Sequence, residues 1–246
     1  MTPLENFNGI YFKREDLNPS GSVKDRWLSQ KIVSGQQYVI SSSGNAAISA
    51  QYFNPNVTVF VSPKTNPSKL KLIKNYHLTS QPQSDAFKYA KTNNLELLRQ
   101  STDPVALEGY GHIAEELLIQ LPQITSIFIP VGSGTTLLGL AHKLPSSVKV
   151  FAVQPASHCP IASFFDKNFI SETETITDAL SVKLLPLKNK ILKTIKYGIV
   201  VQNSAVIKYV DKFSPETALC LAGLEKAKNL FEVGDYPVIL VTGVKR

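Results

Sequence analysis

Lys24 is the first residue whose type and position indicate chemistry. It lies in the first turn of a helix expected near residues 23–34, for which Ser22 fits the N-cap. The positive end of the helix dipole disfavours an ammonium there, so the pKa of this lysine is expected to be lowered. A neutral lysine can attack an aldehyde and form a Schiff base. The alternative is a surface lysine paired with Asp25 or Glu15, and the residues alone leave both interpretations open.

A serine-rich turn carries a second candidate function. It consists of Ser42, Ser43, Gly44 and Asn45. Small residues at the start of a helix let backbone N–H groups face an anion, and the helix N-terminus adds partial positive charge. The turn can therefore bind a substrate carboxylate, with Asn45 hydrogen-bonded to a ring substituent of a bound cofactor. The alternative is a serine-rich N-cap that binds no ligand.

A glycine-rich turn between an apolar strand and an apolar helix has the layout of a phosphate cradle. It consists of Gly132, Ser133, Gly134, Thr135 and Thr136. A P-loop would need Lys-Ser or Lys-Thr after Gly139, where Leu140 and Ala141 stand. A dinucleotide-binding turn would need glycine at Leu137 and an acid at Gln154. Neither ATP nor NAD is supported, which leaves a phosphate monoester.

The other reactive side chains form no recognisable site. The four histidines are scattered without the spacing of metal ligands, and Cys159 and Cys220 are too few for a thiolate site or a disulfide scaffold. The sequence therefore predicts no metal.

Strands and helices alternate along the chain, which predicts a parallel sheet covered by helices on both faces. The expected strands are 10–12, 38–41, 57–61, 95–98, 126–130, 148–153, 198–201 and 237–241. The expected helices are 23–34, 45–53, 67–76, 82–93, 104–121, 135–143, 203–212 and 215–230. Ligands of such sheets bind at the carboxyl ends of the strands, so the turns described above are expected to meet there.

Composition excludes several classes of protein. The chain has 246 residues, 43% of them hydrophobic and 18% charged, which argues against a disordered chain. No apolar run approaches the length of a membrane span and no signal peptide is visible, so a cytoplasmic protein is expected. The formal net charge is +7, and residues 26–84 and 179–210 contain no carboxylate. These sparse lysines favour an anionic small molecule over nucleic acid.

A lysine suited to Schiff-base chemistry, a carboxylate cradle and a phosphate loop together suggest pyridoxal phosphate. The chain resembles the fold-type II, tryptophan-synthase-β-like enzymes that use this cofactor, although 246 residues is short for the class. The segments that carry the resemblance are Thr2–Leu4, Lys13–Arg26, Ser42–Asn45, Glu108–Glu116, Gly132–Thr136 and Thr242–Gly243.

The resemblance implies a role for each of these segments. Lys24 would bind the cofactor as a Schiff base and act as general base and acid. The turn from Ser42 to Asn45 would hold the substrate carboxylate, with Asn45 also contacting the 3-oxygen of the cofactor. Gly132–Thr136 would bind the phosphate, and Thr242 the pyridine nitrogen. A neutral pyridine nitrogen would favour β- or γ-elimination and replacement over transamination.

The resemblance also implies an architecture: two open three-layer α/β domains with mainly parallel sheets and the cofactor in the cleft between them. Residues 1–37 and 126–246 would form the larger, cofactor-binding domain, and residues 38–125 a smaller inserted domain. The expected partners are a small amino-acid substrate and, as one alternative, a second copy of the chain. Nucleic acid and membrane are not expected.

Within this class, Ala46 and Ala47 after Asn45 favour a threonine synthase, a lyase of amino-acid biosynthesis that converts O-phosphohomoserine to threonine and phosphate. A serine or threonine ammonia-lyase, a cysteine-synthase-like enzyme and a cofactor-binding module without turnover remain as alternatives.

Overall fold

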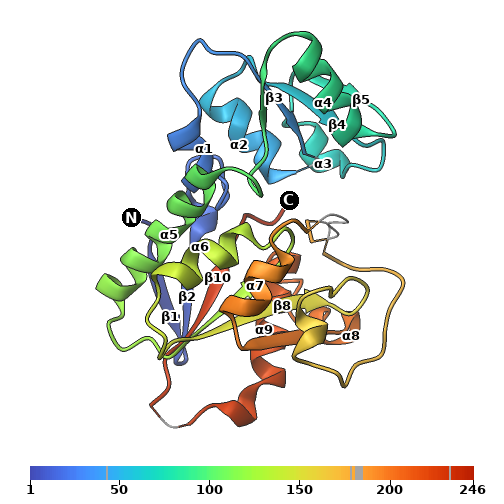
Figure 1. The fold of residues 1–246 in the computed structure, drawn as a ribbon. Coiled ribbons are helices and arrows are strands. Elements are labelled where there is room, and N and C mark those ends of the chain that lie inside the picture. The colour runs from blue at the N-terminus through green and yellow to red at the C-terminus, as the bar shows by residue number, and fades with distance from the viewer. Residues whose placement is uncertain (43, 178, 181–184, 233) are drawn as a thin grey trace.

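The computed structural model describes residues 1–42, 44–177, 179–180, 185–232 and 234–246, and its strands form two sheets, one above the other in Figure 1. The larger sheet has the order β1-β2-β10-β7-β8-β9. Its strands are β1 (Leu4–Phe7), β2 (Ile10–Arg14), β7 (Ser126–Pro130), β8 (Lys149–Pro155), β9 (Tyr197–Val201) and β10 (Pro237–Val241). β1 pairs antiparallel with β2, and all other pairs are parallel.

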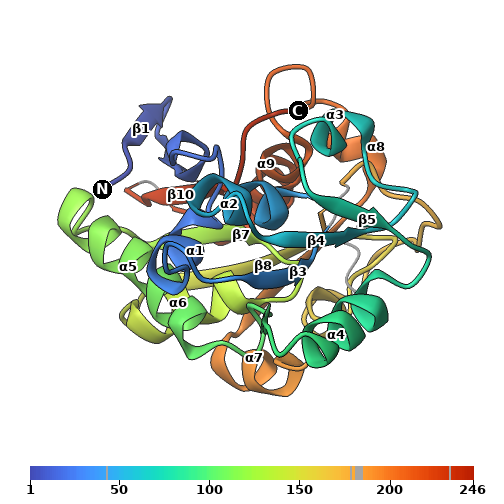
Figure 2. The ribbon, with the colours of Figure 1, turned by 90° about the horizontal axis from the view of Figure 1, so that it is seen from above.

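The smaller sheet is entirely parallel, in the order β5-β4-β3-β6. Its strands are β3 (Tyr38–Ser41), β4 (Thr58–Val61), β5 (Tyr76–Leu78) and β6 (Glu96–Leu98). Viewed from above in Figure 2, this sheet lies over the strands of the larger one. The α/β fold class with mainly parallel sheets is thereby confirmed.

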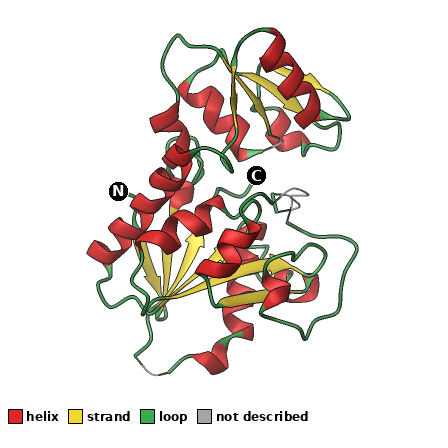
Figure 3. Cartoon of the chain, viewed as in Figure 1, coloured by secondary structure: helices red, strands yellow, loops and turns green. Residues whose placement is uncertain are grey.

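Helices cover both faces of the sheets (Figure 3). They are α1 (Asp25–Lys31), α2 (Asn45–Phe53), α3 (Pro67–Leu70), α4 (Pro82–Thr92), α5 (Pro104–Gln120), α6 (Thr135–Lys143), α7 (Lys188–Thr194), α8 (Asn203–Val206) and α9 (Pro215–Lys226). Short 3-10 turns are η1 (Glu15–Leu17), η2 (Ala162–Phe164) and η3 (Lys228–Leu230). Proline opens α3, α4, α5 and α9, where a missing N–H costs no hydrogen bond.

Alternation along the central strands divides the core in two. Successive residues of a strand point to opposite faces, so Ile127 and Ile129 join one apolar cluster while Phe128 joins the other. The register aligns Phe128 with Ile239 on one neighbouring strand and with Phe151 on the other, and these side chains pack on the α9 side of the sheet. The larger cluster lies on the other side and continues through α1 into the smaller sheet.

One expected helix is wrong in part, and one strand was missed with it. The helix expected over 67–76 ends at Leu70, and Tyr76–Leu78 forms the edge strand β5, whose residues are all exposed. The alternation of buried and exposed residues that reveals a half-buried strand is therefore missing from β5. The edge strand β1 was missed as well. The expected helices over 203–212 and 215–230 end earlier, at Val206 and Lys226.

The contacts of α5 indicate which of the two units this helix belongs to. The smaller sheet begins with β3 at Tyr38 and ends with β6 at Leu98, while α5 packs against α1 and α6. We propose that the smaller unit runs from residue 38 to about residue 100 and that α5, which lies inside the expected small domain 38–125, packs with the larger one. The chain crosses between the units after α1, before Tyr38, and again near Gln100.

Within the described ranges, no helix is both long and apolar enough to cross a membrane.

Candidate active site

Lys24 lies immediately before the first residue of α1, where a short backbone ladder joins it to the end of the chain. The N–H of Val23 donates to the carbonyl of Thr242 at 2.9 Å, and Ser22 pairs with Gly243. The expected N-cap is wrong in detail, because Lys24 takes that position and Ser22 Oγ accepts from the N–H of Lys24 at 3.3 Å. The ladder places the predicted Schiff-base lysine beside the predicted partner of the pyridine nitrogen.

The side chain of Lys24 has neutral partners. Its Nζ donates to Oε1 of Gln100 at 3.0 Å and lies 5.5 Å from the centre of the Tyr110 ring. Burial lowers the pKa of Lys24 from 10.5 to about 8. The pKa of Lys24 is therefore lowered, as the sequence predicts. The cause is desolvation, which penalises the charged form of a lysine.

The alternative of a surface lysine paired with an acid does not hold. Asp25 accepts hydrogen bonds from the N–H and hydroxyl of Ser20 and from the hydroxyl of Ser49, and Glu15 forms an ion pair with Arg26. Among the ion pairs of the described residues, none involves Lys24. Its amine is therefore available for chemistry.

The glycine-rich turn connects β7 to α6 as the sequence predicts. Gly134 caps α6 with a φ of +81°, a left-handed conformation that favours glycine, and a Cβ there would lie 2.2 Å from Cδ1 of Ile191. Ser133 Oγ and Thr135 Oγ1 lie 3.1 Å apart. A positive-φ glycine followed by a nine-residue helix presents backbone N–H groups to an anion, as a phosphate cradle requires.

Gln154, where a dinucleotide-binding site would place an acid, has a structural role. It is fully buried, its Nε2 donates to the carbonyl of Val131, and its Oε1 accepts from the N–H groups of Ile161 and Ala162. These bonds hold the segment after β8 against the strand that leads into the glycine-rich turn.

The serine-rich turn lies next to Gly243, the residue of the ladder that pairs with Ser22. Gly44 caps α2, and its N–H donates to Ser42 Oγ at 3.3 Å. Asn45 opens the helix, accepts from Nη1 of Arg246 at 3.1 Å, and lies so close to Gly243 that a Cβ there would be 2.5 Å from Nδ2. Ser43, the remaining residue of the predicted carboxylate turn, lies outside the described residues.

Gln100 is the residue that the sequence analysis missed. It follows β6, its Oε1 accepts from Lys24 Nζ and from the hydroxyl of Tyr110 at 2.9 Å, and its Nε2 donates to Ser133 Oγ at 2.8 Å. Its position after a parallel strand was a usable signal. The turn it occupies lacks the serine and glycine pattern that marked the other three.

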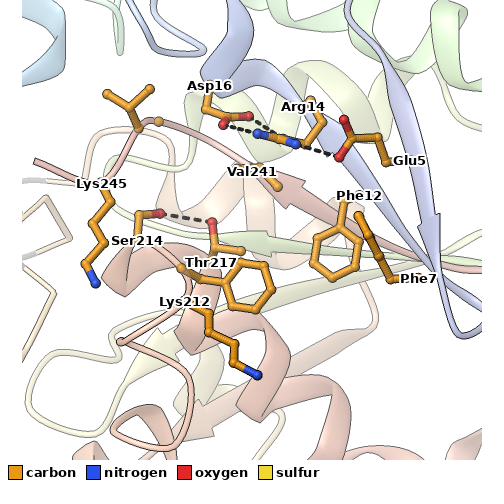
Figure 4. Close-up of a pocket in the computed structure, with 13 residues that line it drawn as sticks. Glu5, Phe7, Phe12, Arg14, Asp16, Lys212, Ser214, Thr217, Val241 and Lys245 are labelled. Carbon is orange, nitrogen blue, oxygen red and sulfur yellow. Dashed lines mark hydrogen bonds and ion pairs between the residues drawn. The ribbon is translucent and has the colours of Figure 1, made fainter.

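A cavity of about 350 Å³ (Figure 4) lies on the α9 side of β10, and its lining includes Gly243 of the ladder. Its lining includes Phe12, Val241 and Thr217, and Figure 4 shows the Arg14 guanidinium between the carboxylates of Asp16 and Glu5. Lys24 is not among the described residues that line it. No group of three or more His, Cys, Asp or Glu side chains in the described part of the chain could hold a metal.

Comparison with protein families decides the class. A model described as "Pyridoxal-phosphate dependent enzyme" matches residues 1–243. The chain belongs to this family. The family resemblance and the cofactor expected from the sequence are thereby confirmed.

The described residues fit this cofactor on two observations from the structure. A lysine amine of lowered pKa suits the aldehyde, and the left-handed Gly134 at the start of α6 suits the phosphate. The assignments of Asn45 to the 3-oxygen and of Thr242 to the ring nitrogen stay predictions.

Curated relatives of the chain include a threonine ammonia-lyase and threonine dehydratases. L-threonine ammonia-lyase of Geobacter sulfurreducens is 28% identical over 199 residues, covering 71% of this chain and 49% of that protein. The biosynthetic L-threonine dehydratase of Pasteurella multocida is 29% identical over 184 residues, covering 63% and 36%. The chain spans about half the length of the curated relatives it matches.

Solved structures share the fold. Maize serine racemase matches with a TM-score of 0.85 at 20% identity, covering all of this chain and 88% of that one. The processed form of threonine deaminase isoform 2 from Solanum lycopersicum matches with a TM-score of 0.81 at 22% identity, covering 100% and 79%.

Proposed function

We propose that the protein is a pyridoxal-phosphate-dependent ammonia-lyase that converts serine or threonine to the corresponding 2-oxo acid and ammonia. The observation that carries this proposal is the amine of Lys24, which has a pKa of about 8 and neutral partners at the junction of the serine-rich turn, the glycine-rich turn and Thr242. The names of the curated relatives support the substrate class.

When bound, pyridoxal phosphate supplies an electron sink for the α-carbon of an amino acid. Different residues of this chain then bind the substrate and transfer its protons. The N–H groups at the start of α2, next to Ser42 and Gly44, bind the substrate carboxylate. Neutral Lys24 takes the proton from the α-carbon at Nζ, and the resulting ammonium can protonate the departing hydroxyl. A pKa near 8 suits both directions of this transfer.

Thr242 is the neutral partner proposed for the ring nitrogen. Its hydroxyl can donate or accept a hydrogen bond without adding charge, unlike a carboxylate, which would favour a protonated ring nitrogen. An unprotonated ring is a weaker electron sink, which favours elimination from the β-carbon over transamination.

The preference for threonine synthase drawn from Ala46 and Ala47 is not supported. The curated relatives named here are threonine ammonia-lyases and dehydratases, which agrees with the alternative of a serine or threonine ammonia-lyase. Two alanines after Asn45 begin the buried face of α2, where small side chains also serve packing.

The test is a substrate panel with the cofactor-loaded protein. L-serine and L-threonine should each release a 2-oxo acid, measured with a coupled dehydrogenase, and Lys24→Ala should release none. Release of phosphate and threonine from O-phosphohomoserine, without a 2-oxo acid from serine or threonine, would restore the threonine synthase interpretation. Cofactor binding without any product would indicate a binding module.

A further inference from the structure

Gln100 links the two ends of the proposed cofactor site. Its amide oxygen accepts from Lys24 Nζ at 3.0 Å and its amide nitrogen donates to Ser133 Oγ at 2.8 Å. Ser133 in turn lies 3.1 Å from Thr135, so the chain of contacts runs from the lysine into the glycine-rich turn. A single side chain from the segment after β6 therefore spans both features of the larger unit.

The second contact of the amide oxygen fixes its orientation. The hydroxyl of Tyr110, a fully buried residue, donates to the same Oε1 at 2.9 Å. An amide oxygen has two lone pairs, so Lys24 and Tyr110 together saturate it. With Nε2 occupied by Ser133, the amide has one orientation that satisfies all three partners, and the position of Nζ follows from it.

The ionisable groups near Lys24 are either paired with other residues or neutral, so the charge of residue 100 strongly affects the protonation of the amine. On its own segment the nearest ionisable groups are Asp25, held by Ser20 and Ser49, and Arg26, paired with Glu15 and Glu116. Tyr110 faces it from α5, and burial raises the pKa of this phenol far above its usual value, so it is neutral. Arg246 approaches the same segment through the carbonyl of Ser20.

We propose that Gln100 is a positioning residue that holds Nζ of Lys24 toward the cofactor site as a neutral amine and ties it to the phosphate turn through Ser133. Because Oε1 receives an N–H of the amine, the nitrogen lone pair points away from Gln100. A carboxylate at this position would favour the ammonium and make the lysine unreactive at neutral pH. This inference rests on the proposed role of Lys24.

The experiment measures how fast Lys24 of the full chain forms a Schiff base with pyridoxal phosphate as a function of pH. The product is trapped with borohydride and the Lys24 peptide is quantified by mass spectrometry. Gln100→Glu should raise the pH midpoint by about one unit or more and slow trapping at pH 8 roughly tenfold, since an opposite charge within hydrogen-bond distance raises a lysine pKa. Gln100→Met, which removes the acceptor, should not raise the midpoint.

Gln81→Glu is the matched control, since it makes the same change of charge at an exposed position before α4, and its midpoint should equal that of the wild type. A Gln100→Glu midpoint equal to the wild type, or an equal rise with Gln100→Met, would overturn the role of Gln100. Absence of trapping at Lys24 in the wild type would instead overturn the proposed function on which it rests.

Discussion

Two lysines eleven positions apart show how partners decide the fate of an amine that is shielded from water. Lys13 is fully buried, and its Nζ contacts Glu116 at 2.5 Å, the carbonyl of Thr2 at 2.9 Å and Gln120 at 2.9 Å. Lys24 has Gln100 and the ring of Tyr110 instead. Burial lowers the pKa of both lysines, but in Lys13 the hydrogen bond and charge of Glu116 oppose that effect.

The region around Lys13 is an ionic tie between elements. Burial acts to raise the pKa of Glu116, yet hydrogen bonds from Arg26 and Lys13 hold that pKa down at about 2. Arg26 also pairs with Glu15, so β2, η1, α1 and α5 share one network of charges. A lysine in such a network is held by carboxylates that favour its charged form and ties elements of the fold together, while a lysine with neutral partners has no such opposing charge. The comparison therefore predicts opposite consequences when each lysine is removed.

The largest effect is expected at Lys24. Lys24→Ala should abolish borohydride-trapped cofactor and lower 2-oxo acid formation by on the order of 10³-fold or more, since the variant lacks the amine proposed as nucleophile and base. Both quantities are measured on the same preparation, with far-ultraviolet circular dichroism as the check on folding. Cofactor trapped on a different lysine with activity retained would contradict the assignment.

Removing Lys13 should affect stability and leave the chemistry in place. Lys13→Met should lower the free energy of unfolding by about 3 kcal/mol, since it strips a buried carboxylate of one partner. Urea titration of the apo protein measures the loss, and trapping at Lys24 should persist in the folded fraction. Adding Glu116→Gln should cost less in the Lys13→Met background than in the wild type. Strictly additive losses would mean that the two charges are not coupled.

A smaller effect is expected from removing the hydroxyl of Thr242, the proposed partner of the ring nitrogen. Thr242→Val should lower turnover roughly tenfold, about 1.4 kcal/mol in the barrier, through loss of the hydroxyl. Stability should hold, because the carbonyl of residue 242 still accepts from Val23. Thr217→Val is the control, a buried threonine whose hydroxyl contacts Ser214 on the α9 side. Equal losses of turnover in both variants would remove the special role of Thr242.

The smallest effect is a pH dependence of stability. Between pH 8 and 10.5 the folded chain binds fewer protons at Lys24 than the unfolded chain does. The free energy of unfolding therefore increases as the pH rises through this range. Well below pH 8, Lys24 is protonated in both states, and the full cost of removing its charge from water lowers the stability of the fold. Lys24→Met should therefore melt higher than the wild-type apo protein at pH 7, by roughly 2–6 °C, and the difference should close toward pH 10.5. A constant difference across this range would show that the pKa is not lowered.

The sequence predicted the three turns because turn residues and helix starts are encoded locally. Gly134, for instance, stands where the chain needs a positive φ before α6, and no neighbouring residue has to be known to expect it. The edge strand β5 and the end of α3 could not be predicted in this way. The residues of β5 are all exposed and carry no periodicity, and it is the pairing with β4 that makes Tyr76–Leu78 a strand.

What the sequence determined by itself is the cofactor class. It also gives the order of the segments proposed to bind the cofactor, which we expect to meet because parallel strands bring their carboxyl ends to one edge. What the tertiary structure decided is the environment of the Lys24 amine. Burial, which depends on segments distant in sequence, lowers the pKa of Lys24, and a contact across 76 positions gives it Gln100 as a partner. Side-chain partners across a fold follow from packing in three dimensions, which local patterns do not record.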